Sequence, residues 1–387
     1  MKLLVVSTSF PMRPGDSLSP FLWEYCLGLK DRGWDITVLV PHHTGLKLEE
    51  NWENINIKRF KYLPERYENL AYSGGLMPGL RRSPLKGLKL PFYIYSMYSE
   101  ALRIISSGGI DIVNFHWLFP ACFWLRRFKA KTGIPIVLTG HGTDVRLAIA
   151  GLFRFFAHRS LAITSALTLN SDYMKGILKD LITHTTVEVI PMGVDTERFK
   201  PGIESPSKSK RILYIGRLIE QKGVGILLDA FCEVIKKIPE ARLEIIGYGP
   251  QKEYLVDKIG DANLFNAVKI SDPVGYDFLP EKYRSARVLA LPSLIPEGLG
   301  MTAVEAGACG VPTVTFGLGG TSEYVINEDT GIIVDKNKKA LAEGMIRILS
   351  DDALADRMGQ NARQSTLERY LWPVISEKFD RLFRQLI

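Results

Sequence analysis

A strand–helix–strand pattern that recurs along the chain is the feature that most constrains its fold. A short apolar run at residues 3–7 is followed by a helical segment at residues 21–32 and by a second apolar run at residues 36–40. Gly33, which follows the helix, suits the left-handed conformation that ends many helices. Because parallel strands need a crossover between them, this stretch is predicted to be a βαβ unit.

The same alternation continues through the first half of the chain and begins again after residue 210. Residues 201–210 (PGIESPSKSK) have the polar composition of a linker. Two doubly wound α/β domains joined near residues 200–210 are therefore predicted. A final helical segment is expected at residues 371–386, and its own sequence pattern does not indicate to which domain it belongs. Further strands are expected at residues 110–115, 134–139, 166–170 and 187–190, and then at 212–215, 243–246, 267–270, 288–291, 312–316 and 332–334.

Composition excludes several other classes of protein. The 387 residues are 46% hydrophobic and 24% charged, which is typical of folded globular domains. No uncharged apolar run is long enough to span a membrane, and no cleavage-like site follows the apolar start, so neither a spanning helix nor a secretory signal is expected. The four cysteines are far apart and form no C-x-x-C pair, which fits a reducing cytoplasm better than a disulfide framework.

The net charge of +7 lies entirely in the first half of the chain. Residues 1–198 contain 24 Lys and Arg against 17 Asp and Glu, whereas residues 199–387 contain 25 of each kind. A surplus of positive charge that is confined to one domain attracts partners of negative charge to that domain. We therefore expect the first domain to meet an anionic partner.

The loops that follow the strands are the places to search for a site, because ligands of open α/β sheets bind beyond the carboxyl ends of the strands. After the strand at residues 212–215, Gly216 and Gly223 flank Arg217 and Lys222 at the entry to a helix. Glycines allow close approach of the backbone, and the two cations suit a diphosphate. A solvated loop with ordinary surface cations is the alternative.

A second candidate loop follows the strand at residues 288–291. Glu297 and Glu305 stand on either side of a turn, Gly298-Leu299-Gly300, that opens a helix of small residues. Glu297 is expected to accept hydrogen bonds from sugar hydroxyls and Glu305 from a ribose, while the amides of the turn face an anion. The alternative is a glycine-rich turn before a buried helix, in which Glu305 would need a cationic partner.

The segment from Gly298 to Ala303 also satisfies the dinucleotide fingerprint G-x-G-x-x-A, with Glu323 about twenty residues further on. However, six residues separate Gly298 from the end of the strand near Leu291. That separation is too long for the tight first turn that a pyrophosphate crossover requires. A dehydrogenase is therefore disfavoured.

Candidate residues in the first half also follow strands. His141 lies between two glycines at a strand end, where it can donate a hydrogen bond to a ligand, and Asp144 is expected to cap the following helix. His116 follows another strand, but a half-buried structural histidine beside Trp117 is an equal alternative. Asp16 is placed to reach an acceptor hydroxyl or, equally, to serve as a turn residue.

Several catalytic motifs are absent from the sequence. It contains no D-x-D, no H-E-x-x-H, no Walker loop and no G-x-S-x-G. Charge on a leaving diphosphate would therefore be stabilised by Arg217, Lys222 and backbone amides. Neither a metal ion nor a cofactor is expected.

Taken in order along the chain, these segments resemble the retaining family-4 glycosyltransferases, which have the GT-B fold of two facing Rossmann-like domains. The resemblance covers nearly the whole length. The matching segments are residues 33–38 (GWDITV), 141–144 (HGTD), 190–195 (IPMGVD) with Phe199 and Pro201, Gly216-Arg217, Lys222-Gly223, 247–250 (GYGP), Pro292-Ser293, 297–305 (EGLGMTAVE), 309–312 (CGVP), and Gly319-Gly320 with Glu323.

The resemblance implies roles for both domains and for individual residues. Residues 1–200, joined by a helix at 371–387 that crosses back, would bind the acceptor, and residues 201–370 would bind the nucleotide-sugar donor. Arg217 and Lys222 would hold the donor diphosphate, Glu297 the sugar and Glu305 the ribose, and His141 would approach the anomeric centre. The implied donor-binding residues are Gly15, Gly216, Arg217, Lys222, Glu297, Gly298, Leu299, Gly300 and Glu305, the implied catalytic residues are His141, Arg217, Lys222 and Glu297, and Asp16, His116 and Asp144 are candidates for acceptor binding.

The function that the resemblance implies is the metal-independent transfer of a hexose, with retention of configuration, from a nucleotide diphosphate sugar to a lipid-linked or polysaccharide acceptor. The alternative is a nucleotide-sugar protein of the same fold that does not transfer, such as an epimerase-like enzyme or a non-catalytic binder. The presence of Arg217, Lys222, Glu297 and Glu305 argues against a degenerate binder.

Basic residues interleaved with aromatic residues suggest where the anionic partner binds. Residues 81–95 contain four cations and no acid, and residues 123–131 combine four cations with Phe123, Trp124 and Phe128. This pattern suits peripheral attachment to the anionic inner face of the cytoplasmic membrane. A solvated face above core aromatics is an equal alternative, and nucleic acid is disfavoured because no binding motif for it is present.

Overall fold

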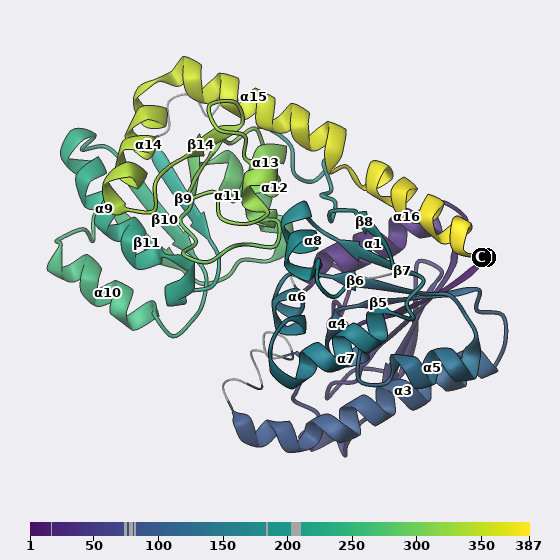
Figure 1. Cartoon of the computed structure of the whole chain (residues 1–387). Helices are drawn as coiled ribbons and strands as arrows, with labels where there is room; N and C mark the ends of the chain where they lie inside the picture. The colour runs from purple at the N-terminus through teal and green to yellow at the C-terminus, as the bar shows by residue number, and fades with distance from the viewer. Residues whose placement is uncertain (17, 73–75, 77–79, 81–82, 183–184, 203–209) are drawn as a thin grey trace. The chain divides into compact units, whose positions relative to one another are not determined.

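The computed structural model describes the chain except for residues 17, 73–75, 77–79, 81–82, 183–184 and 203–209 (Figure 1). The chain divides into two compact units. Unit 1 contains Met1–Pro191 and Ile375–Ile387, and unit 2 contains Met192–Val374. The cations Arg81 and Arg82, which the sequence assigned to a membrane-facing segment, lie outside the described residues.

Unit 1 is built on an eight-stranded sheet in the order β3-β4-β2-β1-β5-β6-β7-β8. All neighbouring strands are parallel except β3 and β4, which form an antiparallel hairpin at one edge. The sequence prediction missed this hairpin because β3 is short and mostly polar, and the apolar residues of β4 do not form a continuous run. The strands are β1 (Lys2–Val6), β2 (Asp35–Pro41), β3 (Glu49–Trp52), β4 (Ile55–Phe60), β5 (Ile112–His116), β6 (Ile136–Gly140), β7 (Ala166–Leu169) and β8 (Thr186–Val189).

Helices cover both faces of this sheet. As a result, every residue of strands β5, β6 and β7 is buried. The first helix packs on one face, and the helices that follow β4, β5 and β6 pack on the other (Figure 1). The helices are α1 (Pro20–Lys30), α3 (Leu90–Ser106), α4 (Leu118–Ala121), α5 (Leu125–Thr132), α6 (Thr143–Ala148), α7 (Gly151–Leu161) and α8 (Asp172–Leu178), with 3₁₀ turns η1 (Glu65–Tyr67) and η2 (Pro84–Lys89).

The last helix of the chain, α16 (Trp372–Leu386), completes the core of unit 1. Phe379 meets the ring of Tyr25 edge-on at 5.0 Å, and Phe383 meets Trp34 at 5.7 Å between ring centroids. The indole Nε1 of Trp34 also donates a hydrogen bond of 2.8 Å to Asp380. The expected return of the final helix to the first domain is confirmed.

Unit 2 is built on a six-stranded parallel sheet in the order β11-β10-β9-β12-β13-β14. The chain runs from β9 towards one edge and from β12 towards the other, so the switch point of the sheet lies between these two strands. The strands are β9 (Arg211–Ile215), β10 (Arg242–Ile246), β11 (Val268–Ser271), β12 (Val288–Leu291), β13 (Thr313–Thr315) and β14 (Gly331–Ile333). The helices are α9 (Val224–Lys237), α10 (Lys252–Asp261), α11 (Leu279–Arg284), α12 (Met301–Ala308), α13 (Thr321–Tyr324), α14 (Lys338–Ser350) and α15 (Asp352–Arg369), with η3 (Glu220–Lys222) and η4 (Tyr276–Phe278).

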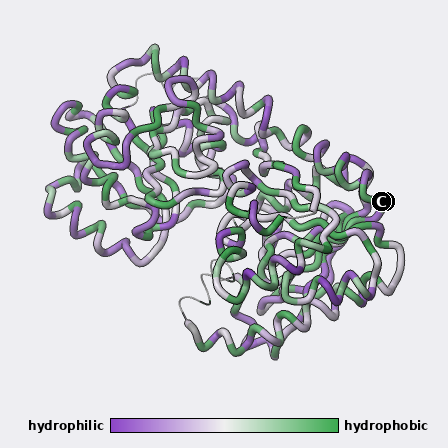
Figure 2. The backbone as a smooth tube through the Cα atoms, in the orientation of Figure 1, coloured by the Kyte–Doolittle hydropathy of each residue, from purple (hydrophilic) through white to green (hydrophobic). Residues whose placement is uncertain are grey.

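Hydropathy follows this architecture in each unit. The strands consist mostly of hydrophobic residues, while hydrophilic residues alternate with hydrophobic ones along the helices (Figure 2). Among the described helices, none is both long enough and apolar enough to cross a membrane.

The aromatic residues beside the basic segment of α5 belong to the core of unit 1. Trp124 and Phe128 are 7% and 0% exposed, and both contact the buried ring of Phe115. Phe123 is partly buried against the same core. These three aromatic residues therefore pack in the core, as the alternative interpretation expected for them, and do not form an exposed surface.

Candidate active site

The loop after β9 is held against the neighbouring loops without space for additional side chains. The amide of Gly216 donates to the carbonyl of Ile246 at 3.0 Å, and a Cβ at Gly247 would lie only 1.9 Å from the Gly216 oxygen. At the other end of the loop, Gly223 has a φ of +71° and packs against Pro292. Between these anchors the side chain of Arg217 is exposed.

Replacement of Gly223 by alanine is expected to destabilise the protein by about 2 kcal/mol or more. A Cβ at this position would lie 2.0 Å from the carbonyl oxygen of Pro292, and the positive φ adds strain. Urea unfolding of the full chain measures the effect. Gly225→Ala is the matched control because a Cβ there would meet only Tyr254, at 3.5 Å. If Gly223→Ala has the same midpoint of urea unfolding as the wild type, the expectation is contradicted.

The loop after β12 joins the loop after β9 through an ion pair. The Nζ of Lys222 donates to Oε1 of Glu297, and the hydroxyl of Ser293 donates to the same oxygen. The Lys222 and Glu297 side chains are 20% and 16% exposed, so the pair is only partly solvated. The structure thus brings together two predicted site residues that are far apart in the sequence.

The backbone of Glu297 is fixed by the loop after β13. Its amide donates to the carbonyl of Leu318, and its carbonyl accepts from the amide of Gly320, both at 3.0 Å. Gly319 has a φ of +74°, and a Cβ there would lie 2.5 Å from the Glu297 carbonyl oxygen. Three strand-end loops therefore determine the position of this carboxylate.

The turn Gly298-Leu299-Gly300 leads directly into α12. Leu299 is buried at 4% exposure, and Gly300 is the N-cap of the helix with a φ of +87°. The first amides of a helix have no partner within the helix, so they present partial positive charge at its start. The expected glycine-rich entry to a helix of small residues is present beside Glu297.

Glu305 is buried in α12 and has a partner that the sequence did not reveal. The hydroxyl of Tyr283, on α11, donates to Oε2 of Glu305 at 2.6 Å. Burial raises the pKa of Glu305 to about 7, although the hydrogen bond from Tyr283 acts in the opposite direction. A tyrosine hydroxyl thus serves where the sequence suggested a cation, and no local motif marks Tyr283 for this role.

The raised pKa predicts that stability depends on pH through Glu305. Since the ordinary value is 4.5 and the folded value about 7, the folded state binds more protons than the unfolded state between these limits. Stability should therefore fall as pH rises across this window, by on the order of 3 kcal/mol from this group. Chemical unfolding of the wild type and of Glu305→Gln from pH 4.5 to 8 measures the free energy of unfolding as a function of pH. If that free energy depends on pH equally steeply in both proteins, the prediction is contradicted.

Two histidines at the strand ends of unit 1 contact each other. His116 Nδ1 lies 3.0 Å from His141 Nε2, and the ring of His141 also packs against Trp117 at 4.6 Å and Phe21 at 5.2 Å between centroids. Burial lowers the pKa of His141 to about 3, and burial together with His141 lowers the pKa of His116 well below its usual value. Both rings are therefore neutral near pH 7, so one donates and the other accepts.

Asp144 connects two loops, and its carboxylate also interacts with the first-turn amides of α6, its own and that of Val145, although it is not the N-cap residue. Its Oδ1 accepts from the amide of His141 at 3.0 Å, and its Oδ2 accepts from the amide of Leu118 at 2.9 Å. The N-cap position of α6 is occupied by Gly142. Asp144 thus fixes the backbone at His141 relative to the loop after β5.

Asp16 folds its own loop. Its carboxylate accepts from the amides of Met12 at 3.1 Å and Leu18 at 3.2 Å. Gly15 beside it is exposed and has a φ of +82°. This arrangement matches the alternative interpretation of Asp16 as a turn residue.

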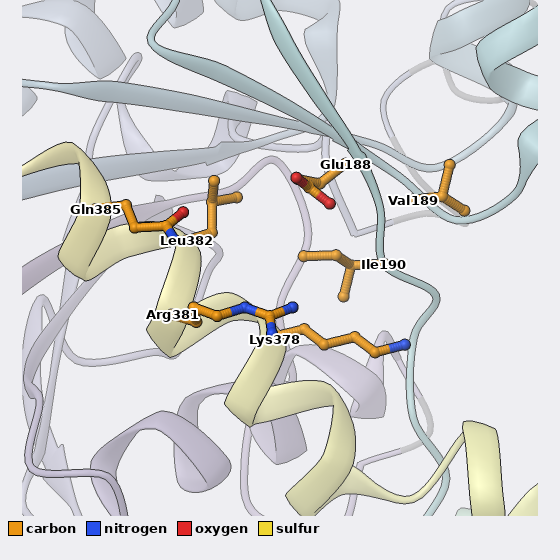
Figure 3. Close-up of a pocket in the computed structure, with 7 residues that line it drawn as sticks. All are labelled: Glu188, Val189, Ile190, Lys378, Arg381, Leu382 and Gln385. Carbon is orange, nitrogen blue, oxygen red and sulfur yellow. The ribbon is translucent and has the colours of Figure 1, made fainter.

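A pocket of about 240 Å³ lies elsewhere in unit 1, between β8 and α16 (Figure 3). None of the residues predicted for the site lines it. Within the part of the chain that the structure describes, no three His, Cys, Asp or Glu side chains are grouped so that they could hold a metal ion. The pocket is lined by Glu188, Val189, Ile190, Lys378, Arg381, Leu382 and Gln385.

Two doubly wound units, with the final helix packed on the first, define the GT-B class of glycosyltransferases. Sucrose-phosphate synthase from Thermosynechococcus elongatus matches 100% of this chain and 99% of its own with a TM-score of 0.80 and 20% identity. HepE from Anabaena, solved with UDP and glucose, covers 100% of both chains with a TM-score of 0.74 and 18% identity. At these identities the likeness establishes the fold.

Sequence comparison identifies the family. The Glycosyltransferase Family 4 pattern matches residues 19–198, and the glycosyl transferases group 1 pattern matches residues 195–365. An uncharacterized glycosyltransferase of Methanocaldococcus jannaschii is 32% identical over 99% of this chain and 98% of its own. The chain therefore belongs to family 4 of the glycosyltransferases, and it is a glycosyltransferase.

A more distant relative has a named reaction. The GDP-mannose-dependent alpha-(1-6)-phosphatidylinositol monomannoside mannosyltransferase of Mycolicibacterium smegmatis is 26% identical, over 96% of this chain and 95% of its own. Its name specifies a nucleotide-sugar donor and a lipid acceptor for that protein. The roles of the individual site residues in this chain remain predictions.

Proposed function

We propose that this chain is a retaining hexosyltransferase whose unit 2 binds a nucleotide diphosphate sugar. The observation that carries the proposal is the ion pair of Lys222 with Glu297 at the switch point between β9 and β12, with exposed Arg217 in the same loop as Lys222. Cations and helix amides suit a diphosphate, and a carboxylate suits sugar hydroxyls. These groups therefore combine both kinds of contact that such a donor requires.

Leaving-group stabilisation is the main chemical task in the proposed reaction. The bond between the anomeric carbon and the β-phosphate oxygen breaks, and negative charge accumulates on the departing diphosphate. Arg217, Lys222 and the first amides of α12 would stabilise that charge in place, with no metal required. The Lys222 ammonium, neutralised by Glu297 in the absence of ligand, would then be shared between the carboxylate and the phosphate.

Retention would follow from attack on the same face of the sugar. The acceptor oxygen forms the new bond to the anomeric carbon, and its proton passes to the departing phosphate oxygen. The products are thus the glycosylated acceptor and a nucleoside diphosphate. Neutral His141 would donate a hydrogen bond to a sugar oxygen without adding a positive charge near the developing oxocarbenium ion.

The acceptor is proposed to be lipid-linked or a saccharide, bound by unit 1 at the inner face of the cytoplasmic membrane. The surplus of positive charge in the first half of the chain supports an anionic partner there. The lipid acceptor named for the mycobacterial relative supports the same class of substrate. No cofactor is proposed, since the donor itself supplies the activated sugar.

A donor panel tests this proposal. The full chain is incubated with UDP-, GDP- and ADP-hexoses, with and without lipid and saccharide acceptors, and release of nucleoside diphosphate is measured in the presence and absence of EDTA. One preferred donor, acceptor-stimulated release and no effect of EDTA are expected. Interconversion of donor sugars without transfer would contradict the proposal and indicate an epimerase-like enzyme.

A further inference from the structure

Four large apolar side chains form an exposed row along η2 and α3 in unit 1. They are separated by three, four and three residues, a spacing that places them on one side of the segment. The opposite side of α3 is buried through Tyr93 and Met97. The exposed fractions are 78% for Leu85, 74% for Leu88, 57% for Phe92 and 69% for Tyr95.

The neighbouring helices of the same layer extend this exposed surface. Helix α5 packs against both α3 and α7, and the three helices lie on the same face of the sheet (Figure 1). On α7, Leu152 is 77% exposed and Phe155 54% exposed. On α5, between them, Arg126 and Arg127 are exposed.

The charges on this layer are nearly all positive. Segments η2, α5 and α7 contain no Asp or Glu, and the single acid of α3, Glu100, is hydrogen-bonded to Arg103 at 3.0 Å. The guanidinium of Arg159 lies 5.1 Å from the ring of Phe155, which combines a cation with an exposed aromatic ring. Exposed apolar residues beside an excess of cations match the two components of an anionic lipid surface.

We infer that the outer face of η2, α3, α5 and α7, here called the basic–apolar face, inserts its apolar side chains into a bilayer that contains anionic lipids. Apolar side chains that project from helix surfaces suit the fluid boundary between headgroups and acyl chains. The arginines of α5 and α7 would contact lipid phosphates. The inference deepens the proposed function, since it rests on the proposal of a membrane-held acceptor for unit 1.

Vesicle flotation of the full chain tests the inference. Vesicles of phosphatidylcholine with an equal amount of phosphatidylglycerol are compared with vesicles of phosphatidylcholine alone, at low and high salt. Binding is expected only with the anionic lipid, and it should weaken as salt rises. No binding to either kind of vesicle, or equal binding to both, would overturn the inference.

Paired variants test which residues act. L88S/F92S is expected to weaken binding about tenfold or more through lost apolar insertion, and R126Q/R127Q by a similar factor at low salt. The matched control F265S/F278S removes two residues of unit 2 that are 65% and 64% exposed, and it should bind as the wild type does. Wild-type binding by the first two variants would contradict the inference.

Two further measurements separate the remaining outcomes. Tyr95→Trp should add fluorescence that brominated lipid quenches, because the residue would lie among the acyl chains. If L88S/F92S instead converts a self-associating protein to a monomer, the face is an interface between copies and the inference is wrong. Donor turnover with a soluble acceptor is measured separately, so failure of transfer with intact vesicle binding counts only against the proposed function.

Discussion

Lys222→Ala is expected to lower kcat about 10²–10³-fold, which is the effect of removing one preorganised group that stabilises transition-state charge. The ammonium of Lys222 is held beside Glu297 at the carboxyl ends of β9 and β12. In the proposed reaction its charge would therefore be in place before the diphosphate begins to leave. Steady-state kinetics over a range of donor concentrations measure the change, and a rise in KM with unchanged kcat would contradict the assignment.

A matched lysine distinguishes this effect from a general loss of positive charge. Lys236 lies on α9 of the same unit, where it is exposed and forms a surface ion pair with Glu233 at 3.0 Å. Lys236→Ala should retain wild-type kcat and nearly wild-type stability, since exposed pairs contribute little. A comparable loss in both variants would indicate that overall charge, and not the position of Lys222, determines the rate.

Glu297→Ala is expected to reduce kcat/KM about 10²-fold while affinity for the nucleoside diphosphate is retained. Hydrogen bonds to a charged acceptor contribute more than neutral ones, and the substitution also leaves Lys222 without its partner. Kinetics and calorimetric titration of the diphosphate measure the two quantities. Ser293→Ala, which removes one hydrogen bond to the same carboxylate oxygen, should cost no more than about tenfold.

A parallel loss of diphosphate affinity in Glu297→Ala would contradict a role in sugar recognition. The carboxylate would then act on the phosphates indirectly, by holding Lys222. Glu297→Gln helps to separate the two functions, because the amide retains hydrogen-bonding capacity for a hydroxyl but no longer neutralises the lysine. If the kcat/KM of Glu297→Gln is closer to the wild-type value than that of Glu297→Ala, a direct contact between residue 297 and the sugar is supported.

The fold was largely predictable because its signal is local. Short apolar runs alternate with helical segments, and each expected strand from residues 3–7 to residues 332–334 has a counterpart in one of the two sheets. The hairpin of β3 and β4 was not predictable from this signal because β3 is mostly polar with no buried residue and the apolar residues of β4 do not form a continuous run. Assignment of α16 to unit 1 depended on the family resemblance, since its contacts with Trp34 join distant parts of the chain.

The contacts within the candidate site were less accessible to sequence reasoning. Lys222 and Glu297 were each predicted from their own loops, but their ion pair depends on β9 and β12 being neighbours in the sheet. The contact between His116 and His141 depends in the same way on β5 and β6. Tyr283 contacts Glu305 through the packing of α11 on α12, which no spacing rule specifies.

The central claim, sugar transfer with retention from a donor held at the strand ends of unit 2, is tested most directly by NMR of a single reaction. The preferred donor and acceptor are incubated with the full chain, and the anomeric configuration of the first product is recorded together with nucleoside diphosphate. An α-linked donor should yield an α-linked product and one diphosphate for each sugar transferred. A β-linked first product, or diphosphate release without any glycosylated acceptor, would contradict the account.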